Sequence, residues 1–347
     1  MQQKPKPKKK IPKKPKARKN NWKLRSAAIK NNFLKLVSAI LLVPACVLYA
    51  ESVKPGRLKI ITTLFPLYDF SRQIGQDRVN VVLLLPPGVE PHSWEPTPKD
   101  IVNISTADVF IYTSRQMEVW AEKILTGINK KNPLIVEAGR GIDSEVKNIN
   151  QEHRHHPADP LPDKEHTHEY DPHIWVDPLL ASLLARAIFT SLSQTDPPSS
   201  DFYRKNAELL FKKFNELDLQ IKQSLSGCRQ HTLVFGGHFA FGHFVKRYNL
   251  EFIPAYRGFS PNSEPSARQL AYLIKTVKEK NIKYIYYEEL LSPKLAYMLS
   301  KETGCALLLL HAAHNVGREE IKKNITYFDI MTGNIENLKK GLECGNN

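Results

Sequence analysis

The stretch FYRKNAELLFKKFNELDLQI (Phe202–Ile221) decides how the chain is organised, because it predicts one long amphipathic helix. Apolar side chains recur along it at the three- and four-residue spacing that places them on one face of a helix. They are Phe202, Leu209, Leu210, Phe214, Leu217 and Ile221. Helical sequence extends from Pro178 to Gly227, with a break at TDPPSS (195–200). Strands alternate with helices on both sides of this region, so we expect the helix to join two halves.

The half before the helix predicts four buried strands. LKIITTLFPLYDF (58–70) predicts a strand that runs into a helix, and VNVVLLL (79–85) predicts a second strand, followed by a Pro/Gly loop and a helix capped near Thr97. ADVFIYTS (107–114) and PLIVEAG (133–139) predict two more strands. Strands that alternate with helices indicate a parallel sheet with crossover helices.

The half after the helix repeats this pattern. Strands are predicted for HTLVFGG (231–237), LEFIPAY (250–256), IKYIYYEE (282–289) and CALLLLH (305–311). Helices are predicted for ARQLAYLIKTVKEKN (267–281), for SPKLAYMLSKETG (292–304), closed by Gly304, and for ITYFDIMTGNIENLKKGL (325–342). The predicted fold class is therefore α/β, with two parallel-sheet lobes joined by a long backbone helix.

Length and charge are consistent with this organisation. The chain has 347 residues, 41% of them hydrophobic, which is enough for two compact units. Its net charge is +15, but residues 1–50 hold fourteen Lys and Arg and no Asp or Glu, so +15 less 14 leaves +1 for the rest. The positive charge belongs to a tail, and a nucleic-acid-binding domain would instead carry it on the folded surface.

Residues 1–50 predict a basic, disordered leader and a signal peptide. KPKPKKKIPKKPKARK (4–19) cannot form a core. LVSAILLVPACVLYA (36–50) is short for a membrane span, which needs about 20 apolar residues, but has the length of a signal-peptide apolar region. We expect cleavage after Ala50; lipidation of Cys46, in the lipoprotein-like box VPAC (43–46), and an uncleaved anchor are alternatives. Each places the folded part outside the cytoplasm, in the periplasm or cell envelope.

Three further cysteines, Cys228, Cys305 and Cys344, would then lie in an oxidising compartment, where disulfides persist. Three cysteines permit one bond and one free thiol, and the sequence leaves the pairing open. Cys228 and Cys344 each end a helical stretch, so a bond to one of them is reasonable. No pair has CxxC spacing, which argues against a cysteine zinc site.

Histidines are concentrated and well placed for metal chemistry. Five of the twelve lie within residues 152–168, inside a polar segment (143–171) that we interpret as a His-rich loop. They are His153, His155, His156, His166 and His168. The expected domain organisation is a leader (1–50), a first lobe (51–142), this loop, a closing segment with the linker helix (172–228) and a second lobe (229–347).

Four other histidines are candidate ligands. His92, His238 and His311 each follow a predicted strand, and His173 precedes the long helical region. Ligands of open α/β sheets bind outside the carboxyl ends of the strands. Neutral imidazole suits zinc, copper, iron and nickel. We therefore expect two imidazoles from each half to meet in one interlobe cleft.

Three stretches of sequence around these positions, which we call the family phrases, resemble a known family. PPGVEPHSWEPTPKDI (86–101), DPHIWVDP (171–178) and GGHFAFGHFVKRYNLEFIPAYRGFSPNSEPSARQL (236–270) closely resemble the zinc/manganese substrate-binding proteins of ABC importers. The resemblance runs from about Leu58 to Leu342, and phrases of this length make it specific. It implies two α/β lobes joined by a rigid helix, with four side chains holding one metal ion between them.

The resemblance also implies a ligand set, one position at a time. His92, in PHSWEPTP, matches the first ligand, His173 the second and His238 the third. Phe239 departs from the aspartate that usually follows the third ligand, which puts the support of His238 in doubt. The fourth ligand is usually a carboxylate after the last strand; here LHAAHN (310–315) offers His311, our prediction, with His314 and then Glu288 as alternatives.

This ligand set favours zinc over manganese as the transported metal, because manganese prefers more oxygen ligands. Copper, nickel and iron remain compatible with imidazole. Zinc members of the family often carry a His-rich loop beside the site, and here such a loop would collect metal at low affinity near the cleft. A solvated linker with incidental histidines is the alternative interpretation.

The predicted function is that of a monomeric, extracytoplasmic binding protein that captures a zinc ion and delivers it to an ABC importer permease. It is not expected to be an enzyme. A zinc hydrolase using His92, His173 and His238, with Glu288 as base, is the second hypothesis, although no HExxH motif occurs. A surface adhesin is the third, and the Lys/Pro leader would matter to it only if retained.

Overall fold

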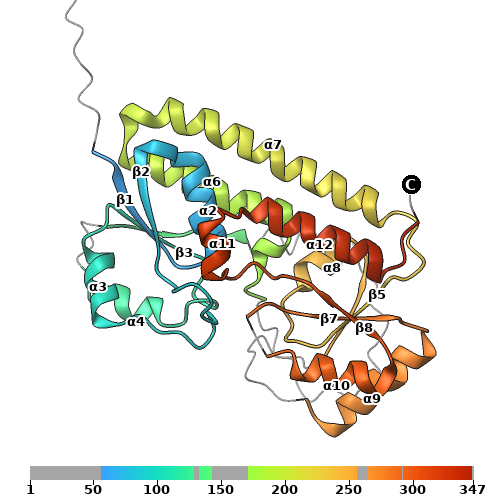
Figure 1. Ribbon diagram of the computed structural model, residues 1–347. Coiled ribbons are helices and arrows are strands. Elements are labelled where there is room, and N and C mark those ends of the chain that lie inside the picture. The colour runs from blue at the N-terminus through green and yellow to red at the C-terminus, as the bar shows by residue number, and fades with distance from the viewer. Residues whose placement is uncertain (1–55, 129–132, 143–170, 256–264, 291, 346–347) are drawn as a thin grey trace, which may run out of the picture. The chain divides into compact units, whose positions relative to one another are not determined.

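The computed structural model describes residues 56–128, 133–142, 171–255, 265–290 and 292–345 (Figure 1). The predicted leader (1–50) and residues 143–170 of the predicted His-rich loop lie outside this range, as do residues 256–264 of the third family phrase. Within the described ranges, no helix is both long enough and apolar enough to cross a membrane.

The first half of the described chain forms a four-stranded parallel sheet in the order β2-β1-β3-β4. Its strands are β1 (Leu58–Thr62), β2 (Val79–Leu83), β3 (Val109–Tyr112) and β4 (Leu134–Glu137). Its helical segments are α2 (Phe65–Gly75), η1 (Gln76–Arg78), α3 (Pro98–Ser105) and α4 (Ala121–Leu125). All four predicted strands of this half are confirmed.

The second half forms another four-stranded parallel sheet, with the corresponding order β6-β5-β7-β8. Its strands are β5 (Thr232–Phe235), β6 (Glu251–Pro254), β7 (Tyr284–Tyr287) and β8 (Ala306–Leu309). Its helices are α8 (Gly242–Arg247), α9 (Ala267–Glu279), α10 (Lys294–Thr303), α11 (Arg318–Lys322) and α12 (Tyr327–Gly341). The short helices α8 and α11 were not predicted.

Between the sheets the chain is helical: η2 (Ile174–Val176), α6 (Pro178–Thr195), η3 (Pro197–Ser199) and α7 (Ser200–Leu225). The predicted long helix is α7, which has 26 residues and leads into β5. It packs against α6, α2 and α12, and Figure 1 shows it extending alongside α6 and α12. The α/β fold with two parallel sheets is thus confirmed, whereas the rigidity of the helix remains a prediction.

Local sequence signals explain where helices begin and end. Thr97 and Asp100 form a capping box at α3: the Thr97 hydroxyl accepts the Asp100 N–H at 3.3 Å, and the Asp100 carboxylate accepts the Thr97 N–H at 2.9 Å. Gly304 ends α10 at φ 77°, a left-handed conformation that costs glycine little. Both boundaries were predicted from these residues.

The main core is continuous across the two halves. Phe70 of α2 and Phe214 of α7 pack edge to face, with ring centroids 5.1 Å apart, and Tyr327 of α12 lies 5.2 Å from Phe70. The Tyr327 hydroxyl donates to the backbone oxygen of Trp175 at 2.8 Å. The last helix of the chain therefore packs on the first half. The predicted domain boundaries remain predictions.

The segment after β8, residues 310–317, also returns to the first half, and we call it the crossing segment. Its His314 oxygen accepts the N–H of Phe65 at 3.1 Å, at the start of α2. The Asn315 amide donates to the backbone oxygens of Pro86 and Val89, at 2.7 and 3.0 Å, in the loop after β2. Side chains on the crossing segment are thereby held against the carboxyl ends of β1 and β2.

A disulfide joins Cys228, after α7, to Cys344, after α12, and Cys305 is a buried free thiol. The bond connects residues 116 positions apart. A cross-link over a loop of this length removes much conformational freedom from the unfolded chain, worth about 4–5 kcal/mol in the chain-entropy model.

We predict that thiol labelling of the denatured, non-reduced chain from Glu51 modifies Cys305 alone, and that reduction lowers the free energy of unfolding by about 2–5 kcal/mol. Peptide mapping and urea unfolding with and without reductant measure the two effects. A C305S variant is the control and should lose the label while keeping the response to reductant. Labelling at all three cysteines would contradict the assigned pairing.

Candidate metal centre

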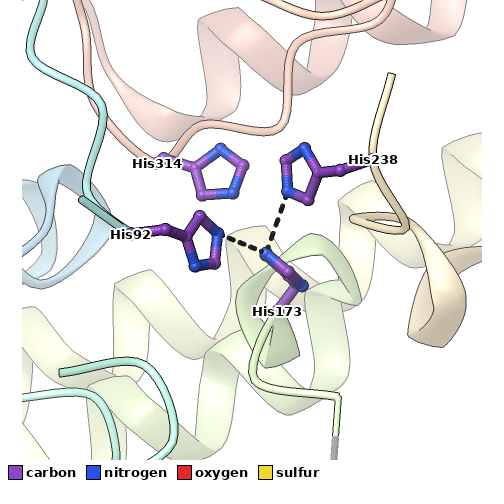
Figure 2. Close-up of side chains that lie close together, drawn as sticks. All are labelled: His92, His173, His238 and His314. Carbon is purple, nitrogen blue, oxygen red and sulfur yellow. Dashed lines mark hydrogen bonds between the residues drawn. The ribbon is translucent and has the colours of Figure 1, made fainter. Parts of the chain in front are cut away.

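Four histidines converge at the carboxyl ends of strands from both sheets. One nitrogen from each of His92, His173, His238 and His314 lies within 4.8 Å of the other three, and we call this group the histidine cluster. Figure 2 shows the four rings turned toward a common point, with His314 brought in by the crossing segment. His92 is half-buried and the other three are buried.

His92 lies in the loop between β2 and α3, and Glu90 shapes this loop. One carboxylate oxygen of Glu90 accepts the His92 N–H at 2.8 Å, and the other accepts the Ser93 N–H at 2.9 Å. Nε2 of His92 lies 3.1 Å from Nε2 of His173. The stretch PPGVEPHSW (86–94) therefore forms a turn stabilised by its own Glu90 side chain, and this turn directs the imidazole inward.

His173 precedes η2 and is held by Asp171. The Asp171 carboxylate accepts both the His173 N–H, at 3.0 Å, and the Nδ1–H of the ring, at 2.8 Å. A Cβ at Gly242 would overlap Oδ2 of this carboxylate, so glycine at the start of α8 leaves the room that Asp171 needs. With its hydrogen on Nδ1, His173 presents the lone pair of Nε2 to the cluster.

His238 follows β5 and is supported by Glu288, the residue after β7. Oε2 of Glu288 lies 2.6 Å from Nδ1 of His238, and Oε1 accepts the His238 N–H at 3.3 Å. A Cβ at Gly237 would overlap Oε1 of Glu288. Glu288, considered from sequence as a possible ligand, thus lies behind His238.

His314 is supported by the next residue, Glu289. Oε1 of Glu289 lies 3.2 Å from Nδ1 of His314, and Oε2 accepts the Ala312 N–H at 2.7 Å. Nε2 of His314 is buried and has no hydrogen-bond partner among the described residues. This nitrogen is available to a metal ion.

The structure does not bring His311 into the histidine cluster. Its Nδ1 accepts the Ala313 N–H at 2.9 Å, in a turn where Ala313 has φ 59°. The backbone N–H of His311 donates to Asn334 at 2.8 Å, and its oxygen accepts from the same side chain at 2.8 Å. The fourth candidate ligand is therefore His314, and not His311 as predicted from sequence. His231 and His243 also lie outside the cluster.

The spacing within the cluster suits a tetrahedral ion. Zn–N bonds of about 2.0–2.1 Å place tetrahedral ligand nitrogens about 3.3–3.4 Å apart. Nε2 of His173 lies 3.1 Å from Nε2 of His92 and 3.3 Å from Nε2 of His238. The fully buried Trp175 packs against the rings of His173 and His314, with centroids 5.6 and 5.4 Å away. It shields these two rings from water.

Burial and mutual repulsion favour the neutral forms of His92 and His173. Burial, with a contribution from His314 and His238, lowers the pKa of His92 to about 2 and that of His173 well below its usual value. Burial also acts to lower the pKa of His314, but the hydrogen bond and charge of Glu289 outweigh it and raise that pKa. Attraction to His311 and His314 outweighs burial at Glu289 and lowers its pKa to about 2.

These features are those of a transition-metal-binding protein. Four imidazoles, three of them with a carboxylate at the other ring nitrogen, provide the donor set that a transition-metal ion requires, on a two-sheet α/β fold.

The comparisons with known proteins agree with this class. The family model "Zinc-uptake complex component A periplasmic" (ZnuA) matches residues 60–341, and the chain belongs to this family. A curated relative, the high-affinity zinc uptake system protein ZnuA of Bacillus subtilis, is 36% identical over 311 residues, 88% of this chain and 96% of that protein. The zinc-binding lipoprotein AdcA of Streptococcus pneumoniae is 34% identical over 87% of this chain, and the match covers 60% of AdcA.

Solved structures give the same result. The Zn(II)-bound ZnuA-like domain of S. pneumoniae AdcA has a TM-score of 0.68 at 34% identity, covering 83% of this chain and all of that one. The laminin-binding protein Lmb of Streptococcus agalactiae, described as bifunctional with adhesin and metal transporting activity, has a TM-score of 0.69 at 30% identity, covering 82% of this chain and 99% of that one. The predicted family resemblance is confirmed. The prediction of a binding protein and not an enzyme is confirmed as well, since the matched family and curated relatives are zinc-uptake and zinc-binding proteins.

We predict that zinc affinity falls with decreasing pH, with a shallow slope. As the pH falls, metal must displace the Nε2 proton that His314, whose pKa is raised, then carries, whereas the lowered pKa values of His92 and His173 favour their neutral forms. The slope of log Kd against pH should not exceed about two, since two of the four imidazoles release no proton. Competition with a chelator of known proton affinity at pH 5.5, 6.5 and 7.5 measures it. A slope near four would contradict the assigned protonation states.

Proposed function

We propose that this protein captures a zinc ion outside the cytoplasm and delivers it to the permease of an ABC importer. The observation that carries the proposal is the histidine cluster: four imidazole nitrogens lie within 4.8 Å of one another. His92, His173, His238 and His314 would hold the ion. Membership of the zinc-uptake family and similarity to a Zn(II)-bound relative support zinc as the substrate.

The ligand chemistry supports zinc over manganese. The cluster offers four nitrogen donors, and the carboxylates of Asp171, Glu288 and Glu289 lie at the far ring nitrogens instead of facing the metal position. Manganese prefers oxygen ligands, whereas zinc accepts four imidazoles in a tetrahedron. Four protein ligands also close the site, while a catalytic zinc keeps a position open for water. The geometry therefore supports capture over hydrolysis.

The compartment is supported by two observations. Relatives are described as a periplasmic component or as lipoproteins, and the disulfide between Cys228 and Cys344 is of the kind that persists in oxidising compartments. We propose that residues 1–50 direct export, by cleavage after Ala50 or by lipidation of Cys46. The His-rich segment 143–171 would collect zinc at low affinity and pass it to the cluster.

Zinc binding by purified variants tests the proposal. We expect one tightly bound zinc per chain, retained on deletion of residues 152–168. We expect H92A and H314A each to weaken binding by about 100-fold or more, because loss of a supporting residue alone costs about 10–100-fold. The exposed His231 supplies the matched control, H231A, which should bind as the unaltered protein does. Manganese, copper and nickel are titrated in parallel.

Two results would contradict the proposed site. Tight zinc binding that disappears with residues 152–168 and survives H92A would place the metal elsewhere, and tighter binding of manganese than of zinc would overturn the substrate. Delivery is tested in cells lacking the gene: complementation with the unaltered gene should restore zinc accumulation under chelation, and complementation with H314A should not.

A further inference from the structure

Two buried histidines near the fourth position of the site approach the same carboxylate. His311 and His314 lie on the same crossing segment, and Nδ1 of each approaches Oε1 of Glu289, at 3.3 and 3.2 Å. Only His314 belongs to the histidine cluster of the described residues. A residue that contacts both rings is in a position to decide which of them binds metal.

The ring of His311 accepts a hydrogen bond from the backbone. Its Nδ1 accepts the Ala313 N–H at 2.9 Å, so this nitrogen carries a lone pair. The neutral ring then bears its hydrogen on Nε2. The hydrogen that Glu289 would need at Nδ1 of His311 is absent in this tautomer.

The ring of His314 has the opposite arrangement. A carboxylate only accepts hydrogen bonds, so the 3.2 Å contact with Glu289 requires the hydrogen on Nδ1 of His314. The lone pair then lies on Nε2, which is buried and directed into the cluster (Figure 2). This is the tautomer that a metal ligand needs.

Glu289 is itself fixed in place. It follows β7 directly after Glu288, is 7% exposed, and its second oxygen accepts the Ala312 N–H at 2.7 Å. The two consecutive carboxylates therefore serve different ligands: Glu288 contacts His238, and Glu289 contacts His314. The end of one strand supports two of the four imidazoles.

We propose that Glu289 is a positioning residue that selects His314, and not His311, as the fourth metal ligand by holding a hydrogen on Nδ1 of His314. The proposal rests on the proposed function, because it concerns the same metal site. It assigns to Glu289 a role in ligand choice beyond support of the fold.

Replacement of Glu289 by glutamine has a specific consequence. The carboxylate accepts from two donors, the Ala312 N–H and the His314 ring. An amide of the same size has one accepting oxygen and one donating NH2 group. If the oxygen serves Ala312, the NH2 group faces Nδ1 of His314 and favours the hydrogen on Nε2, which blocks metal binding.

A double-mutant cycle tests the proposal. E289Q is introduced into the unaltered protein, into H311N and into H314A, and zinc affinity is measured by chelator competition. The Oδ1 of asparagine at position 311 can accept the Ala313 N–H, as in an Asx-turn, so H311N keeps the turn without an imidazole. We expect E289Q to weaken zinc binding by about 10–100-fold in the unaltered protein and in H311N, and to have no further effect in H314A.

Cobalt spectra provide a readout that a purely structural role would not change. Below the melting temperature of every variant, the unaltered protein and H311N should give the intense visible bands of tetrahedral Co(II), and E289Q should give the weaker bands of a site with bound water. Unchanged zinc affinity in E289Q, or an equal loss in H314A and H311N, would overturn the proposal. If H92A bound zinc as tightly as the unaltered protein, the proposed function itself would fail.

Discussion

The site depends on the carboxylates that lie at the far ring nitrogens of three of its four imidazoles. A neutral imidazole has one lone pair, so the group bonded to Nδ1 determines whether Nε2 can bind a metal ion. Asp171 lies at Nδ1 of His173, and Glu289 lies at Nδ1 of His314. Glu288 occupies the same position behind His238. Three of the four rings are thus oriented before metal arrives, which reduces the cost of ordering the ligands on binding.

The fold brings these carboxylates and rings together through its strand order. In the second sheet, β5 and β7 are neighbours whose crossover connections leave in opposite directions, the point at which open α/β sheets bind ligands. His238 follows β5, and the two glutamates follow β7. The crossing segment then carries His314 to the first sheet, where Phe65 binds its backbone oxygen. Candidate ligands from both halves of the sequence therefore lie in one cluster, and backbone hydrogen bonds join the segments that carry them.

Much of this arrangement could be predicted from sequence, and the exception has a physical reason. Alternating strands and helices predicted both sheets, and the family phrases placed His92, His173 and His238 in one site. We predicted His311 as the fourth ligand, but local sequence does not distinguish it from His314, because both follow β8 within one short loop. In the structure, the left-handed conformation of Ala313 and long-range hydrogen bonds to the first half place His314 in the histidine cluster, and local sequence does not encode these features.

X-ray absorption at the zinc edge tests the central claim most directly, because it counts the ligands of the bound ion. The protein loaded with one equivalent of zinc should show four nitrogen neighbours at about 2.0–2.1 Å, with the outer-shell scattering of four imidazoles. H314A should show three imidazoles and one light-atom ligand, and H311N should match the unaltered protein. Three imidazoles with a bound carboxylate or water in the unaltered protein would contradict the four-histidine site.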